Sequence, residues 1–98
     1  MRLAYTEAAL ADLEDIHQYQ AEHWPLIRPQ FDARLTAIER RISQMPSFAP
    51  EVAERPGVRS IPFISHPYHL FYQVTENVVE ILYIHHTSRR PWYEQVAP

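Results

Sequence analysis

Two apolar runs decide the fold: YHLFYQV at residues 68–74 and VVEILYIH at residues 78–85, separated by the three residues TEN at 75–77. Both runs are rich in Val, Ile, Tyr and Phe, which are enriched in β-strands, and a short polar connection between two such runs predicts a β-hairpin. The second run continues directly into HHTSRRPW at residues 85–92. Imidazole, guanidinium and indole groups would therefore follow a rigid core strand, and we expect this end of the chain to carry the function.

Upstream of the hairpin, residues 7–23 predict an amphipathic helix. The segment contains no glycine or proline, and Ala9, Leu13, Ile16 and Gln20 follow one helical face. Thr6 is suited to be the N-cap, with the acidic Glu7 in the first turn. The pair Trp24-Pro25 then ends the helix, and we expect Trp24 to plug the corner before the next one.

A second helix is expected from about residues 26–28 to Met45. Pro29 fits only the first turn of a helix, and Pro46 stops it. The apolar positions recur at intervals of three and four residues, which is the helical period. They are Ile27, Phe31, Leu35, Ile38, Ile42 and Met45. Two such helices with a short connection predict a helical hairpin.

The remaining segments complete the order β-α-α-β-β-β. Arg2–Tyr5 alternates as a short strand, residues 47–57 with their prolines predict a loop, and residues 58–64 alternate as a strand in which Pro62 requires an edge position or an outward N–H. We therefore predict an α+β fold in which a helical hairpin packs on one face of a small antiparallel sheet. Residues 1–98 are expected to form a single domain, with 93–98 as a frayed tail.

The second face of this sheet is ambiguous from the sequence. On the last strand Val79, Ile81 and Tyr83 alternate with Val78, Leu82 and Ile84, so apolar side chains point both ways. Either a partner covers the face that lacks helices, or the protein buries it by its own fold.

Composition narrows the function classes. The chain has no cysteine, which excludes disulfides and thiolate zinc sites, and no apolar run long enough to span a bilayer. We expect a cytoplasmic protein without a membrane segment. All nine basic residues are arginine and the net charge is −3, so a general electrostatic grip on nucleic acid is not expected.

Several collinear motifs resemble the RelE/ParE superfamily of type II toxins, and together they span nearly the whole chain. The motifs are Ala8-Ala9-x-x-Asp12-Leu13-x-x-Ile16-x-x-Tyr19, Pro46 after the second helix, Val58-Arg59-x-Ile61-Pro62, Tyr68-x-Leu70-Phe71-Tyr72-x-Val74, and Val79-Glu80-Ile81-Leu82-x-Ile84-His85-His86-x-x-Arg89-Arg90-Pro91. The resemblance implies the RelE/ParE toxin fold, no cofactor, and a hetero-oligomer with a cognate antitoxin encoded by the neighbouring gene.

The superfamily implies two possible actions. ParE-like members, of the plasmid-stabilisation type, inhibit DNA gyrase by protein binding and cause growth arrest, whereas RelE-like members are ribosome-dependent mRNA endoribonucleases. The absence of lysine, the negative charge and the histidine-arginine ending favour the ParE-like function. The expected residues for binding target or antitoxin are Arg59, His86, Arg89, Arg90 and Trp92.

The endoribonuclease alternative would use the same end of the chain. His86 could serve as acid or base, because imidazole titrates near neutrality. Arg59, Arg89 and Arg90 could hold the phosphate, and Tyr93 could assist. A competing interpretation gives the histidine and the arginines purely structural or partner-binding roles.

A metal site is not expected. His66, His69, His85 and His86 would lie on adjoining strands, but their spacing matches no zinc motif and no carboxylates cluster near them in the sequence.

Overall fold

The computed structural model describes residues 1–88, which form two long helices and a five-stranded sheet. The predicted tail, residues 93–98, lies outside this range. None of the helices in residues 1–88 is long and apolar enough to cross a membrane. In chain order the elements are β1 (Arg2–Tyr5), α1 (Glu7–His23), the 3₁₀ turn η1 (Pro25–Ile27), α2 (Arg28–Gln44), β2 (Glu51–Val52), β3 (Arg55–Pro62), β4 (Tyr68–Thr75) and β5 (Val78–His86).

The sheet has the strand order β1-β5-β4-β3-β2. The α+β class is confirmed, but the purely antiparallel arrangement was wrong in one pair, because β1 runs parallel to β5. The long connection through both helices and three strands allows this parallel pairing. Strand β2 was missed, since only two residues inside a proline-rich segment pair with β3.

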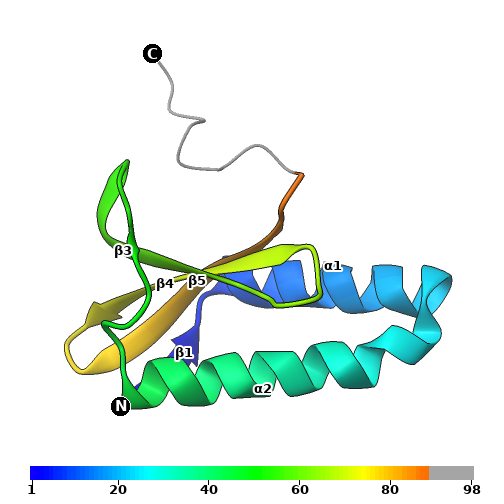
Figure 1. Ribbon diagram of the computed structural model, residues 1–98, viewed down its shortest axis with the longest axis horizontal. Coiled ribbons are helices and arrows are strands. Elements are labelled where there is room, and N and C mark those ends of the chain that lie inside the picture. Colours follow the sequence, from blue (N-terminus) through cyan, green and yellow to red (C-terminus); the bar gives the residue numbers. More distant parts are fainter. Residues whose placement is uncertain (89–98) are drawn as a thin grey trace.

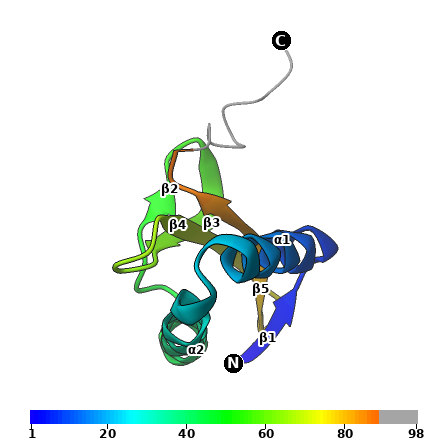
Figure 2. The same cartoon turned by 90° about the vertical axis from the view of Figure 1, so that its right-hand side faces the viewer.

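Both helices begin and end where the sequence signals predict. The Oγ1 of Thr6 accepts a hydrogen bond from the backbone N–H of Ala9 at 3.1 Å, which caps α1. Pro29 lies in the first turn of α2, where its missing N–H breaks no hydrogen bond. Figure 1 shows α2 beneath the sheet, joined to α1 at the right-hand end, and Figure 2 shows α1 beside β5.

The main core lies between the helices and the sheet, as predicted. The helical side chains expected to face the sheet are buried, apart from Leu13, which is partly buried at the edge of the same cluster. The buried ones are Ile16, Phe31, Leu35, Ile38 and Ile42, and they pack with Leu70, Tyr72, Val79, Ile81 and Ile84 of the strands. One prediction at the helix ends was wrong: Trp24 is 64% exposed and does not plug the corner. Met45, the last position of the apolar pattern, is 54% exposed.

A β-bulge in β5 changes which side chains face the core. Phe71 pairs with Tyr83 but the next residue of β4 pairs with Ile81, so Leu82 is an extra residue. The bulge reverses the alternation after this point. Ile84 therefore joins the helix-facing core and Tyr83 lies on the other face, which is the reverse of the predicted alternation.

Helix α1 closes the edge of β5 beyond the bulge, where β1 no longer pairs. The hydroxyl of Thr6 donates to the carbonyl of Leu82 at 3.0 Å, and a carboxylate oxygen of Asp12 accepts the N–H of Ile84 at 3.0 Å. These two side chains satisfy backbone groups that a neighbouring strand would otherwise bind.

The face of the sheet away from the helices has its own small cluster. Val52, Val58 and Phe71 are buried there, and Leu82 and Tyr83 pack against them. The first two residues belong to the β2–β3 pair; β3 rises away from the rest of the sheet at the left of Figure 1. Phe71, which points away from the helices, is therefore buried by the protein's own fold.

Candidate functional site

Arg59 holds the segment between α2 and β2. Its Nη1 donates to the carbonyl oxygens of Ser47 at 3.1 Å and Ala49 at 2.5 Å, and its Nη2 lies 3.6 Å from the carboxylate of Glu51. The Arg59 side chain is 23% exposed, and its guanidinium directs most of its N–H donors at this segment. The structure therefore gives Arg59 a structural role on the helix side of the sheet.

His86 lies at the end of β5 and is exposed. Its Nδ1 accepts the backbone N–H of Ser88 at 3.1 Å and lies 2.7 Å from the Ser88 hydroxyl. Because Nδ1 acts as an acceptor, the proton of the neutral ring is on Nε2. The ring also packs edge-on against Tyr68, with centroids 5.3 Å apart.

The structure does not bring Arg59 and His86 together. Arg59 pairs with Tyr72 and His86 pairs with Tyr68 across β4. These two partners are four residues apart along the strand, which is about 13 Å. Arg89, Arg90, Trp92 and Tyr93, the other predicted site residues, lie outside the described range.

Of the four histidines considered as metal ligands, His66 lies in the connection between β3 and β4 and not on a strand as expected, and the other three are divided between the two faces of the sheet. His69 and His85 are cross-strand partners, as are Tyr68 and His86, and successive residues of a strand point to opposite faces. The Nε2 of His85 lies 3.6 Å from a carboxylate oxygen of Asp12. Within residues 1–88 no group of three or more His, Asp or Glu side chains could hold a metal ion.

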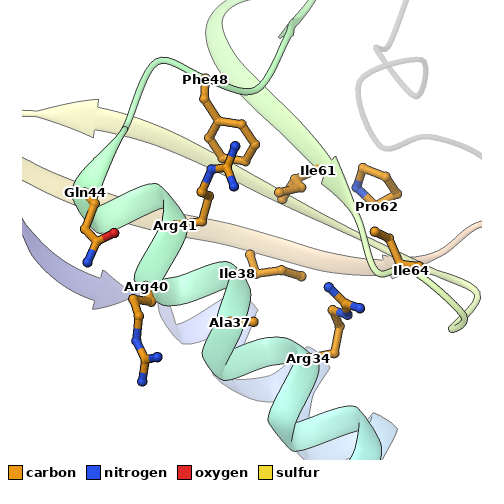
Figure 3. Close-up of a pocket in the computed structure, with 10 residues that line it drawn as sticks. All are labelled: Arg34, Ala37, Ile38, Arg40, Arg41, Gln44, Phe48, Ile61, Pro62 and Ile64. Atoms are coloured by element: carbon orange, nitrogen blue, oxygen red, sulfur yellow. The ribbon is translucent and has the colours of Figure 1, made fainter.

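Sequence reasoning missed a groove between α2 and the β3 edge, shown in Figure 3. Its volume is about 450 Å³. Ile38 and Ile61 form its apolar floor, and Phe48 and Ile64 stand at its sides with exposures of 37% and 61%. Partly exposed apolar side chains around a concave surface are typical of an interaction site.

Three arginines of α2 line this groove: Arg34, Arg40 and Arg41. The guanidinium carbon of Arg41 lies 4.6 Å from the centre of the Phe48 ring, a cation–π contact. In Figure 3 Arg34 reaches toward Ile64, whereas Arg40 points away from β3. None of the described residues that line the groove is acidic, so this surface is locally positive on a chain of net charge −3.

A sequence signal for the groove did exist. Arg34 and Arg41 are seven residues apart and therefore share a helical face, with Ala37 between them. This polar face lies beside the apolar stripe from which the helix was predicted.

The comparisons with known proteins agree with this architecture. The structure of the "Chromosomal ParDE TA system from P. aeruginosa" matches with a TM-score of 0.75 and 24% identity, covering 88% of this chain and 95% of that chain. The isolated E. coli RelE toxin matches with a TM-score of 0.58 and 22% identity, covering 96% of this chain and 92% of that chain. At these identities the two structures show a shared fold.

The family comparison is more specific. A search of curated proteins found no match. The family model described as the ParE toxin of the type II toxin-antitoxin system parDE matches residues 3–91, which is most of the chain. The predicted membership of the RelE/ParE superfamily is confirmed, and the chain belongs to the ParE toxin family of type II toxin-antitoxin systems.

Proposed function

We propose that this ParE-family toxin arrests growth by binding DNA gyrase in the cytoplasm, without cleaving RNA. We further propose that a cognate antitoxin neutralises it by occupying the groove between α2 and β3. The choice between gyrase binding and RNA cleavage depends on how the candidate catalytic groups are placed.

The choice of gyrase binding over RNA cleavage rests on the distance between Arg59 and His86. Cleavage by attack of a 2′-hydroxyl needs an acid or base and a cation at the same phosphate, within hydrogen-bond reach of it. About 13 Å of strand separates the positions of these two residues, and the guanidinium of Arg59 already binds two carbonyls and Glu51. This geometry takes Arg59 out of the endoribonuclease site expected from the sequence, and that loss supports a toxin that acts by protein binding.

The net charge supports the same choice. A protein that works inside the ribosome has to approach a dense array of phosphates, and affinity for phosphates comes largely from positive charge. This chain has nine basic and twelve acidic residues. A protein target does not impose the same requirement.

The groove has the dimensions and charge to bind a helical segment of an antitoxin. From Arg34 to Gln44 it follows ten residues of α2, or about 15 Å. An apolar floor between arginine side chains is complementary to an amphipathic helix with acidic residues at its polar boundary. We therefore infer that the neutralising segment is an acidic amphipathic helix of about three turns.

One parallel experiment tests the proposed target. The purified full-length protein is added to a gyrase supercoiling reaction and, separately, to translating ribosomes with labelled mRNA. We expect loss of supercoiled product and intact mRNA, and the antitoxin should restore supercoiling. Cleaved mRNA together with normal supercoiling would refute the proposal and favour the RelE-like alternative.

A further inference from the structure

A small, partly open cavity lies at the corner where the end of α1, η1, the β3–β4 connection and the end of β5 meet. Its volume is about 110 Å³, well below that of a typical ligand pocket. It therefore has room for one small group. Its walls include Gln20, Trp24, Ile27, His66, Tyr68 and His86.

Gln20 gives the cavity an unused hydrogen-bond acceptor. The residue is 4% exposed, and its side-chain Oε1 is buried without a hydrogen-bond partner among the described residues. A buried carbonyl without a donor destabilises the protein that contains it. A hydroxyl that entered the cavity beside Gln20 would give this carbonyl a donor.

The other walls select a neutral group. No Asp, Glu or Arg occurs among the described residues that line the cavity, so an ion entering it would lose its hydration without gaining an opposite charge. The Nε2–H of His86 supplies a donor, because Nδ1 accepts from Ser88. A phenol group can donate to one partner and accept from another, and its ring suits walls formed by Trp24 and Tyr68.

Exposed side chains around the cavity indicate a protein as the source of this group. Of the cavity walls, Trp24 is 64% exposed and Tyr19 is 54% exposed. Leu26, which precedes the wall residue Ile27 in the chain, is 88% exposed. Aromatic residues around a small pocket are typical of interface hot spots. Ser65, also in the cavity wall, has a φ of 70°, an unusual backbone conformation for a residue other than glycine.

The corner cavity adjoins a hollow that also borders the groove. This shallow hollow is lined by Arg34, Ala37 and Ile64, which also line the groove, and by Ser65 and His66, which also line the cavity. A single segment of a partner could therefore follow α2 from the groove to the corner.

We propose that the corner cavity binds one tyrosine side chain of the antitoxin, adjacent to the segment in the groove. The phenol hydroxyl donates to Oε1 of Gln20, and the flanking residues of the partner contact Trp24 and Leu26. The identity of the partner rests on the proposed function, whereas the chemistry of the cavity can be tested without it.

Two matched peptides test the site on the full-length protein. Ac-Leu-Tyr-Leu-NH₂ and Ac-Leu-Phe-Leu-NH₂ differ by one hydroxyl, and binding is followed by the NMR shifts of backbone amides in residues 19–27 and 64–68. We expect the tyrosine peptide to bind roughly tenfold more tightly, because its hydroxyl pairs with a buried acceptor. Equal affinity for both peptides would show that the hydroxyl is not recognised, and no binding of either would show that the cavity takes no such side chain; each result would overturn the proposal.

Substitutions separate a binding role for Gln20 from a structural one. Gln20→Met keeps the length of the side chain and removes the unpaired carbonyl, so it should raise the Tm and abolish the preference for tyrosine. Gln18→Met, at an exposed position of the same helix, should change neither. A lower Tm with the tyrosine preference retained would show that Gln20 is only structural.

A third variant tests whether a protein is the natural source. Leu26→Ser should lower the affinity for the tyrosine peptide several-fold. It should leave unchanged the affinity for p-cresol, the free side-chain analogue of tyrosine. If the variant leaves the peptide affinity unchanged, the site recognises a small phenol and the assignment to a protein partner is wrong. None of these measurements uses gyrase or the antitoxin, so their outcome is independent of the proposed function.

Discussion

The two faces of the sheet are buried by different means. On one face, long side chains of α1 and α2 meet those of the central strands in a large cluster that includes Phe31, Ile38 and Tyr72. On the other face, the buried apolar residues within residues 1–88 are Val52, Val58 and Phe71, and two of them come from the β2–β3 pair. The first face depends on helices, and the second depends on a local pairing of short strands.

This difference shows where partners can bind. From the sequence, the face without helices was a candidate for a partner, yet Phe71 at its centre is 6% exposed within the chain itself. The groove and the corner cavity instead lie along α2 and at its start, at the margin of the helix layer. A helix packed on a sheet leaves such concave margins, because a cylinder does not cover a twisted surface completely.

The largest effect should come from the helix-facing core. Ile38 is 4% exposed, and Ile38→Ala should cost about 2–5 kcal/mol of the free energy of unfolding, because a cavity remains where the side chain was. Urea unfolding followed by circular dichroism measures this, with the exposed Thr36→Ala as the control. A cost below about 0.5 kcal/mol would contradict the assigned core.

The opposite face should tolerate the same kind of change better. Val58 is 7% exposed, and Val58→Ala removes two methyl groups, which should cost about 1–2 kcal/mol. The small cluster can also relax at the edge of the sheet. If the loss in urea unfolding equals that of Ile38→Ala, the two faces form one cooperative core and the contrast between them fails.

The sequence predicted the first face much better than the second. Helical periodicity identified Phe31, Leu35 and Ile38 directly, because apolar residues spaced three and four apart lie on one face of a helix. The bulge at Leu82 carries no comparable signal, since every residue around it is apolar. Strand β2 was also missed, because pairing over two residues depends on tertiary contacts and not on a local pattern.

The site was predicted less well than the fold. Arg59 and His86 were grouped because both are polar residues within or next to strands, but sequence distance does not show which positions pair across β4. Gln20 was placed on the apolar face of α1, and it is buried. That its side-chain carbonyl has no partner within residues 1–88 depends on neighbours from three other elements, which a pattern along one helix does not reveal.

Charge substitutions in the groove test whether the antitoxin binds at the margin of the helix layer. The double variant Arg34→Glu, Arg41→Glu should bind the antitoxin encoded by the neighbouring gene at least roughly tenfold more weakly at low salt. The reason is that acidic side chains of the groove would then face acidic side chains of the antitoxin. Titration calorimetry measures the affinity, and the difference should shrink as salt rises. Arg2→Glu together with Arg28→Glu is the matched control, because it changes the charge by the same amount at two exposed residues that do not line the groove. Equal weakening by this control would mean that net charge, and not the groove, governs binding.

The smallest effect concerns pH and the contact that joins β1 to the helix layer. The hydroxyl of Tyr5 donates to the carboxylate of Glu39 in α2. Burial, followed by this hydrogen bond and the negative charge of Glu39, raises the pKa of Tyr5 above its usual value.

The folded protein therefore keeps the Tyr5 proton at a pH where the unfolded chain releases it. This contribution to stability is complete below about pH 10, the pKa of an unperturbed tyrosine, and decreases as the pH rises above it. The slope for one such group is at most about 1.4 kcal/mol per pH unit. Urea unfolding between pH 8.5 and 11 should show this loss of stability. Tyr5→Phe should make the decline with pH shallower. The remaining decline is due to Tyr68 and Tyr72, because burial also raises their pKa values. Glu39→Gln keeps an acceptor without the charge and should reduce the slope less than Tyr5→Phe does. If both variants keep the wild-type slope, the contact between β1 and α2 does not contribute to the alkaline loss of stability.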